Sequence, residues 1–451
     1  MSAPEEIWWT RTNALPDLLQ MTFHKKLDGW FKPRTYTHLD YPKTFEQANA
    51  LVKDVTRLIS HSVLPFLAYI DEKRRYQTDN SDRTIAKRLR PRMWSVKSRD
   101  IMYASHADSA IFAFYAMQLQ SCYEKQLNDQ LIDKNVTGYR SGKGSNIDFA
   151  AEAFSELTAR GSATAICCDI SDFFPSIQHD NLKRQLQNVL DTDPLPDVWY
   201  KIFRRMTKYS YINIDKLYSV EGINSKNVPR PLVSDIQLAL NRFRSAKIVI
   251  TNYKSHGIPQ GSPISAVLAN ISMLEFDKRV AFWADQNGSF YRRYSDDILL
   301  IVEPCLEVDG IEMIVNSANS SALQLKVNPG KTEISRFDLS TKGKVVVDRP
   351  FTYLGFTFDG RNVSLRARTL SRYYRRMTYA TRSASKNALK SGSKVSKTFK
   401  RTLISDFTHL GSANLYSYAR RVDSKMVNAV AKRQLRKHFQ IMLRKILYKG
   451  R

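Results

Sequence analysis

Two adjacent acidic residues between two apolar segments constrain the fold of this chain more than any other feature. Asp296 and Asp297 lie in SFYRRYSDDILLIV, where residues of high strand propensity flank a short Ser-Asp-Asp turn. Such flanks on both sides of a tight turn favour a β-hairpin. Adjacent carboxylates at a hairpin tip repel each other unless a cation lies between them. The segment therefore predicts a β-hairpin with two carboxylates at its turn, where a cation would relieve their repulsion.

A third carboxylate, Asp169, ends a separate predicted strand over residues 163–169. Oxygen ligands at strand ends suit Mg²⁺, which binds through one or two carboxylates together with water and substrate phosphates. Two such ions activate a 3′ hydroxyl and stabilise the leaving pyrophosphate in phosphoryl transfer. The alternative is a structural turn, because turns favour Asp for local backbone hydrogen bonds. An Asp-Asp pair alone therefore does not identify a metal site.

Basic charge is concentrated at the C-terminal end of the chain. Of the 451 residues, which carry a formal net charge of +27, residues 361–451 hold 24 Lys and Arg against two acids, Asp406 and Asp423. Apolar residues three and four positions apart in this segment predict amphipathic helices. Clustered basic side chains on helices give salt-sensitive affinity for nucleic acid. A solvated helical face or an anionic-membrane patch is the alternative.

Cysteine spacing and hydropathy argue against several other classes of protein. The four cysteines have no CxxC spacing, so neither a disulfide framework nor a zinc site is expected. The longest apolar runs are far shorter than the ~20 residues that span a bilayer. The acidic start MSAPEEIWW also lacks the apolar core of a signal peptide. We expect a cytoplasmic protein with no membrane partner.

Periodicity predicts further elements. Helices are expected over residues 105–131, 149–159, 181–190, 266–283 and 311–322, and a strand over residues 351–358. Residues 191–255 show no strong pattern. A Ser/Lys-rich stretch over residues 383–397 predicts a loop.

Five segments in order resemble the palm motifs of reverse transcriptases: CCDISDFFPSI, GIPQGSPISAVLANISMLEFD, YRRYSDDILLIV, NPGKT and FTYLGF. They extend over residues 167–356, and GYRSGKGSN upstream resembles a fingers motif. The resemblance implies an α+β right-hand polymerase with fingers, a palm on a central antiparallel sheet, and an all-helical thumb. The implied division is an N-terminal extension (1–90), fingers and palm (91–365) and a basic helical thumb-like domain (366–451).

The resemblance assigns catalytic and metal-binding residues to this sequence. Asp169, the backbone carbonyl of Ile170, Asp296 and Asp297 are the implied metal ligands, with Asp297 the more structural of the acids. Lys331 matches the lysine proposed to protonate the leaving pyrophosphate, and an ordinary phosphate or solvent contact is the alternative.

Residues that contact the incoming nucleotide are implied by the same motifs. Phe174 matches the aromatic steric gate that leaves no room for a ribose 2′-OH, and a core position beside Phe173 is the alternative. Four polar or flexible positions and one aromatic position complete the implied substrate site. They are Gln260 and Gly261 beneath the nucleotide, Tyr294 in the YSDD box, and Arg99 and Arg140 on triphosphate oxygens.

The implied activity is RNA-directed DNA synthesis from dNTPs with two Mg²⁺ ions, or Mn²⁺ as an alternative ion. RDIMYASHADSAIFAFYAMQLQSCYE followed by GYRSGKGSN resembles bacterial abortive-infection and defence-associated reverse transcriptases, which are related to group II intron and retron enzymes. That resemblance implies an antiphage role. Its implied partners are an RNA template, a dedicated noncoding RNA, the DNA product and an accessory defence protein, together with self-association.

Some features leave other functions open. Ser265 is followed by Ala266, whereas intron and retron enzymes usually have Ser-Pro there, and no His/Cys-rich nuclease module follows the thumb segment. Template-independent or protein-primed synthesis would use the same carboxylates. An RNA-binding, maturase-like protein with a vestigial polymerase site is the second alternative. Against it, intact buried carboxylates would be costly to keep without a role.

Overall fold

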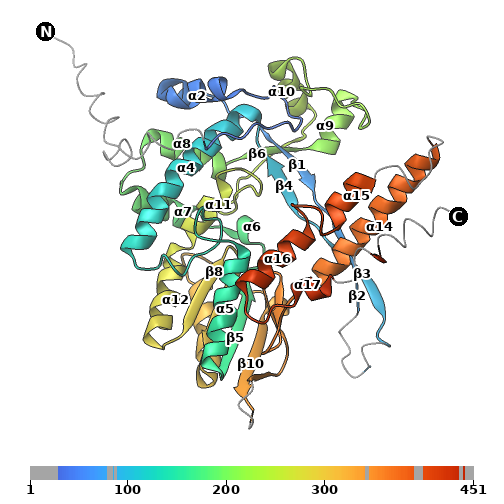
Figure 1. Cartoon of the computed structure of the whole chain (residues 1–451). Coiled ribbons are helices and arrows are strands. Elements are labelled where there is room, and N and C mark those ends of the chain that lie inside the picture. The colour runs from blue at the N-terminus through green and yellow to red at the C-terminus, as the bar shows by residue number, and fades with distance from the viewer. Residues whose placement is uncertain are drawn as a thin grey trace. The chain divides into compact units, whose positions relative to one another are not determined.

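The computed structural model describes residues 29–78, 85, 89–340, 345–390, 400–435 and 440–441. The first 28 residues of the predicted N-terminal extension, residues 391–397 of the predicted loop and most of residues 436–451 lie outside this description. The chain, drawn in Figure 1, forms two compact units, and the segments of one alternate along the sequence with those of the other. The first unit comprises Met1–Asp133, Asp172–Phe276 and Ala318–Leu325, and the second comprises Lys134–Ser171, Asp277–Ser317 and Lys326–Arg451.

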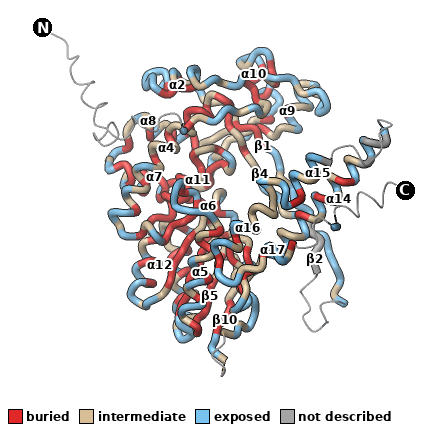
Figure 2. Tube along the Cα trace, in the orientation of Figure 1, coloured by how far each residue is buried: buried red, intermediate tan, exposed pale blue. Residues whose placement is uncertain are grey.

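A five-stranded antiparallel sheet forms the centre of the second unit, in the order β11-β10-β5-β9-β8. Its strands are β5 (Ala163–Asp169), β8 (Phe290–Tyr294), β9 (Asp297–Val302), β10 (Glu333–Leu339) and β11 (Val345–Val347). β5 is mostly buried (Figure 2), and so is β9, as their small and apolar residues predict. The predicted strand over residues 163–169 and the predicted hairpin are confirmed.

Helix α5 (Asn146–Arg160) packs against β5. It begins after a capping box in which Ser145 and Asp148 bond to each other's backbone, and it ends at Gly161, whose φ of 71° suits glycine. The predicted helix over residues 149–159 is therefore confirmed, with one additional turn at its N-terminus.

A second sheet of three short antiparallel strands follows: β12 (Phe351–Tyr353), β13 (Phe356–Phe358) and β14 (Val363–Leu365). The prediction of one strand over residues 351–358 is wrong, because the chain reverses at Leu354 and Gly355. Both residues have positive φ, 45° and 94°, and such backbone angles are typical of tight hairpin turns.

Helices form the C-terminal part of the second unit, as the amphipathic spacing predicts. They are α14 (Ala367–Lys390), α15 (Lys400–Phe407), α16 (Leu415–Lys425) and α17 (Ala431–Gln434). The prediction of a loop from residue 383 is wrong as far as Lys390, because α14 continues to that residue. Buried residues of these helices, including Met377 and Val422, share one apolar core with Leu299 and Phe337 of the central sheet.

The first unit contains a four-stranded sheet in the order β4-β1-β6-β7, with β1 and β6 parallel. The strands are β1 (Phe66–Ile70), β4 (Asp100–Tyr103), β6 (Ser210–Asn213) and β7 (Val249–Thr251). A separate two-stranded sheet pairs β2 (Lys73–Thr78) with β3 (Arg92–Lys97). Residues 191–255, whose sequence shows no strong periodicity, thus contribute β6 and β7.

Helices make up most of the rest of the chain's regular structure. They are α2 (Phe45–Lys53), α3 (Val55–Ser60), α4 (His106–Asp129), α6 (Phe173–Ser176), α7 (His179–Leu190), α8 (Asp197–Thr207), α9 (Ile214–Glu221), α10 (Ile236–Ser245), α11 (Ser265–Ser272), α12 (Leu274–Gln286) and α13 (Glu307–Ala318). The predicted single helix over residues 266–283 is two helices, which meet at Met273. The helix predicted over residues 311–322 begins and ends four residues earlier, as α13.

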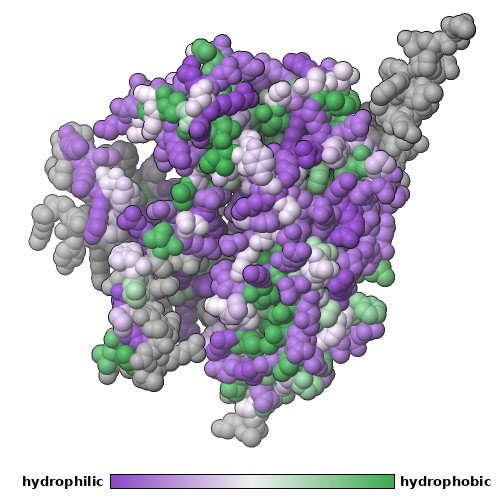
Figure 3. Space-filling view, turned by 180° about the vertical axis from the view of Figure 1, so that it is seen from behind, coloured by the Kyte–Doolittle hydropathy of each residue, from purple (hydrophilic) through white to green (hydrophobic). Residues whose placement is uncertain are grey.

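Within the described ranges, no helix combines the length and hydropathy needed to cross a bilayer. On the face shown in Figure 3, hydrophilic residues cover most of the surface and hydrophobic residues form separate small patches.

Candidate active site

The hairpin of β8 and β9 carries the Ser-Asp-Asp turn. Tyr294 pairs with Asp297 across the two strands, so Ser295 and Asp296 form a two-residue turn. The φ of Ser295 is 61°, and two-residue hairpin turns require positive φ at a central position. Asp296 therefore lies at the tip of the hairpin and Asp297 at the start of β9.

Residues just upstream of GYRSGKGSN support this hairpin from one side. The Arg293 N–H donates to the Asn135 carbonyl (2.7 Å), and the Thr137 N–H donates to the Arg293 carbonyl (2.9 Å). Gly138 lies against the turn so closely that a Cβ there would be 2.5 Å from the Ser295 nitrogen. A side chain at position 138 would have to displace the turn that presents Asp296.

A buried ion pair, which the sequence analysis missed, fixes the hairpin from within. The Arg293 guanidinium donates to both carboxylate oxygens of Asp277, at 2.7 and 2.6 Å, and to the Ser295 carbonyl at 3.0 Å. The Tyr291 hydroxyl donates to Asp277 at 2.6 Å. Arg293 and Asp277 are both 0% exposed. An acid at the end of the apolar stretch ISMLEFD was a usable signal for this contact.

The register of the central sheet brings the third acid to the same place. Asp169, the last residue of β5, pairs directly with Asp297 of β9. The Ile170 N–H donates to the Asp296 carbonyl at 3.3 Å, and the Asn328 N–H donates to the Asp169 carbonyl at 2.8 Å. The structure thus gathers Asp169, Ile170, Asp296 and Asp297 at one end of the sheet.

Three carboxylates lie close together at this end of the sheet, so negative charge is in excess there. Burial, together with the charges of Asp296 and Asp169, raises the pKa of Asp297 to about 7, and Lys331 and Arg366 act in the opposite direction. The Lys331 ammonium, on the turn after Asn328, contacts Asp169 Oδ2. A cation therefore already neutralises part of the charge that the acids create.

Carboxylate and backbone oxygens are the ligands that Mg²⁺ prefers, so the donor type fits the expected metal. The described side chains alone do not supply a full set of ligands in this conformation, so an ion here would also need water or substrate phosphates. Among the described residues, no three His, Cys, Asp or Glu side chains are gathered closely enough to hold a metal ion. A divalent ion on Asp169 would compete with the Lys331 ammonium for Oδ2, and it would lower the raised pKa of Asp297 by offsetting the nearby negative charge.

The predicted gate residue lies in the first unit, in α6. Phe173 is buried, whereas Phe174 is only partly buried, with its ring 5.6 Å from that of Phe173. Phe173 thus takes the core position that was the alternative for Phe174. The Ile258 N–H donates to the Phe174 carbonyl at 3.1 Å, and a Cβ on Gly257 would lie 3.0 Å from the Pro175 carbonyl oxygen. These contacts join CCDISDFFPSI to the GIPQG loop.

The GIPQG loop also contacts β4. The Gln260 carbonyl accepts from the Met102 N–H at 2.8 Å. Gly261 has a φ of 126°, and a Cβ there would lie 2.6 Å from the Met102 carbonyl oxygen. The exposed Arg99 directly precedes β4, so the structure brings three predicted substrate residues of this unit to the neighbourhood of one strand.

The other two predicted substrate residues lie in the second unit. Arg140 is 6% exposed and donates to the Val136 carbonyl at 2.7 Å. Tyr294 is half-buried, and its ring lies 6.5 Å from that of Tyr139 and 6.2 Å from that of Phe149. Their contacts to substrate stay predictions.

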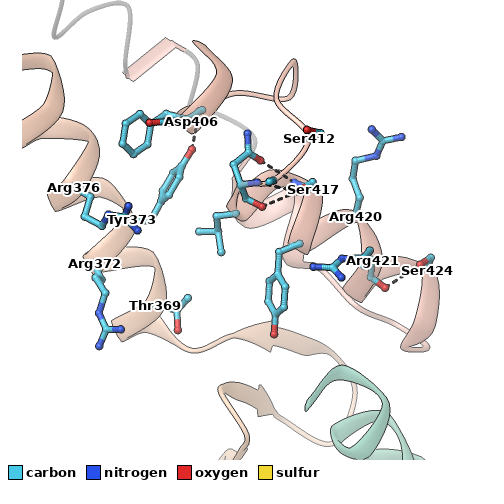
Figure 4. A pocket seen from close by; sticks show the side chains of 15 residues that line it. Thr369, Arg372, Tyr373, Arg376, Asp406, Ser412, Ser417, Arg420, Arg421 and Ser424 are labelled. Atoms are coloured by element: carbon cyan, nitrogen blue, oxygen red, sulfur yellow. Dashed lines mark hydrogen bonds between the residues drawn. The ribbon is translucent and has the colours of Figure 1, made fainter. Parts of the chain in front are cut away.

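A groove of about 1160 Å³ lies between α14 and α16. Arg372 and Arg376 of α14 and Arg420 and Arg421 of α16 line it, and Asp406 is the one acid among its lining residues. Figure 4 shows arginines from the two helices on its opposite sides. The sequence predicted basic helices but could not show which arginines face a common groove.

The central antiparallel sheet presents Asp169, Asp296 and Asp297 at one end. A family model described as reverse transcriptase (RNA-dependent DNA polymerase) matches residues 97–358, more than half of the chain. The chain belongs to this family. The expected family is confirmed, and its membership supports the expected enzyme class, an RNA-directed DNA polymerase.

Solved telomerase structures are similar to parts of the chain. Apo telomerase from Candida tropicalis, truncated from the C-terminal domain, shares 11% identity at a TM-score of 0.40, with 60% of this chain and 52% of that chain covered. Telomerase from Candida albicans, with a fragment of telomeric RNA, shares 12% identity at a TM-score of 0.40, with 78% and 60% covered. This chain spans about half the length of the first of them. No curated protein matches the sequence significantly.

Proposed function

We propose that the chain is an RNA-directed DNA polymerase that adds dNTPs to a 3′ hydroxyl with two divalent metal ions. The observation that carries the proposal is the pairing of Asp169 with Asp297 beside the Asp296 turn, where burial and mutual repulsion raise the pKa of Asp297 to about 7. A partly buried set of repelling carboxylates is costly unless a cation offsets it.

Asp169 and Asp296 would hold the ions, with the Ile170 carbonyl as a further ligand and Asp297 supporting the site from β9. Bound Mg²⁺ would neutralise charge on the transferred phosphoryl group. The Lys331 ammonium, which contacts Asp169 in this structure, would then be released. It could donate a proton to the leaving pyrophosphate or bind the phosphates.

Residues of the first unit would select the nucleotide. The partly exposed ring of Phe174 would exclude a ribose 2′-OH, while the buried Phe173 anchors α6. Gln260 and Gly261 would contact the incoming nucleotide, and Arg99 would bind its triphosphate. The sequence resemblance assigns the same triphosphate role to Arg140.

Residues 366–451 would act as a thumb-like domain that binds the template and the product. The groove between α14 and α16 supports this role, because four guanidinium groups line it against a single carboxylate. Such a surface binds phosphates of either strand without reading sequence. Because the groove lies on exposed helices, it also suits a nucleic-acid backbone that must slide past the protein during synthesis.

The activity is tested by dNTP incorporation on a primed RNA, with a primed DNA and a template-free reaction in parallel. RNA-dependent extension of the primer supports the proposal. Template-free incorporation alone, as homopolymer or as DNA attached to the protein, would favour the untemplated or protein-primed alternative.

The proposed biological setting is antiphage defence in a prokaryotic cytoplasm, with a bound noncoding RNA, an accessory protein and self-association. It rests on the sequence resemblance of residues 99–124 and 138–146. Purification from the host, sequencing of the copurified nucleic acid and extension of that nucleic acid with dNTPs test it. A heterogeneous RNA pool that dNTPs do not extend would count against a dedicated RNA.

A further inference from the structure

A second basic cavity, of about 620 Å³, lies in the first unit. Its walls come from residues 62–66, the C-terminal end of α8, α10, and strands β6 and β7. Four basic residues are among its lining residues: Arg205, Lys208, Arg244 and Lys247. The lining includes no acid and none of the residues assigned above to polymerase chemistry.

Arg205 is the most buried of the four, with 9% of its surface exposed. Its Nη2 donates to the carbonyl oxygens of Leu58 (3.3 Å) and His61. Within the described structure its Nη1 is buried and has no hydrogen-bond partner. A buried donor of a charged side chain that has no partner keeps its full desolvation cost, so the structure leaves a donor to be satisfied.

Asp108 is the acid that acts on Arg205 electrostatically. Its carboxylate is already engaged, because it accepts from the Leu64 N–H at 3.0 Å and the Ser105 hydroxyl at 2.7 Å and contacts His61 Nε2 at 2.8 Å. It therefore makes no ion pair with the guanidinium. Burial lowers the pKa of Arg205, and Asp108 only partly opposes that shift.

The remaining cations increase the unbalanced charge. Lys208 donates to the carbonyls of Tyr253 and Lys254, both at 3.1 Å, which offset none of its charge. Arg244 and Lys247 are exposed at the edge of the cavity. Four like charges around one cavity repel each other, and an anion in the cavity would relieve that repulsion.

We propose that this cavity binds a phosphate group, carried by a nucleic-acid strand or by a free nucleotide. A guanidinium and nearby ammonium groups are the side chains that bind phosphate best, and the volume lies within the range of small-ligand sites. The proposal does not rest on the polymerase function, because no polymerase residue lines the cavity.

Binding by the full-length protein in EDTA tests the proposal, since EDTA removes divalent ions from the polymerase site. The double variant Arg244→Gln/Lys247→Gln removes two exposed cations, and Arg205→Gln removes the buried one. Arg204→Gln/Lys216→Gln is the matched control, because both of its side chains are exposed and neither lines the cavity. The probes are inorganic pyrophosphate, by calorimetry, and a fluorescent ten-nucleotide oligo(dT), by anisotropy.

The Arg244→Gln/Lys247→Gln variant should bind at least one probe about tenfold more weakly than the control variant does. The same probe should protect Lys247 of the wild-type protein from acylation, as measured by mass spectrometry. Weaker binding of pyrophosphate alone identifies free nucleotides as the ligand, and weaker binding of the oligonucleotide alone identifies a strand. The proposal would be overturned if both double variants bind each probe with equal affinity and neither probe protects Lys247. This result does not depend on whether Arg205→Gln folds.

Discussion

The hairpin of β8 and β9 and the groove between α14 and α16 carry charges of opposite sign and hold them differently. The hairpin holds a few acids on a framework of buried bonds, in which Arg293 and Asp277 are 0% exposed. The groove is lined by several arginines, of which Arg420 and Arg421 are exposed. Position therefore matters in the hairpin, where one substitution should have a large effect. Total charge matters in the groove, where single substitutions should have small effects.

Arg293→Leu should show the largest effect on stability. Removal of one partner from a buried ion pair leaves an uncompensated charge on Asp277, and we expect the free energy of unfolding to fall by about 3 to 5 kcal/mol. Urea denaturation measures it. Arg420→Leu in the groove is the control and should change stability by less than ~0.5 kcal/mol. Similar losses in both variants would remove the contrast between the two regions.

The pH dependence of stability should reveal the crowded acids. The pKa of Asp297 is raised from 3.8 to about 7, so the folded protein binds more protons than the unfolded chain between these values. Its contribution should therefore lower stability as pH rises from about 4 to 7, by on the order of 1 to 4 kcal/mol in EDTA. Asp297→Asn should flatten this dependence. Unfolding curves at pH 5 and pH 7.5 measure it, and identical pH profiles of wild type and variant would contradict the shift.

Sequence patterns predicted the elements whose residues carry their own local signal. The strand over residues 163–169 was predictable because it is a short run of small and apolar residues. The Ser-Asp-Asp hairpin was predictable because strand-forming residues lie on both sides of a turn sequence. The ion pair between Asp277 and Arg293 was only half predictable: the acid that ends ISMLEFD is visible in the sequence, but its partner is set by tertiary packing between two elements. The C-terminal helices were predictable from apolar spacing, whereas their groove depends on how α14 and α16 pack.

Sugar selection should depend on Phe174 and not on its neighbour. Phe174→Ala should raise ribonucleotide incorporation relative to dNTP incorporation by about tenfold or more, because the ring no longer excludes the 2′-OH. The ratio of kcat/KM for the two sugars measures it. Phe173→Leu, at the buried position, should lower stability and leave that ratio unchanged. An unchanged ratio in Phe174→Ala would rule out the gate.

The smallest effect should come from the groove. Arg372→Gln/Arg420→Gln removes two cations that line it, and the slope of log affinity for an RNA–DNA duplex against log salt should decrease by about 2. Arg401→Gln/Arg433→Gln has the same charge change outside the groove. Anisotropy titrations at several salt concentrations measure the slopes. Equal slopes for the two double variants would move the nucleic-acid surface elsewhere.

Asp296, at the hairpin tip, should serve the chemistry and not the binding of nucleic acid. Asp296→Ala separates these roles when primer extension with dNTPs and affinity for the primed RNA are measured in the same preparation. We expect extension to be abolished while affinity stays within a few-fold of wild type. Persistent extension by a correctly folded Asp296→Ala protein would contradict this expectation.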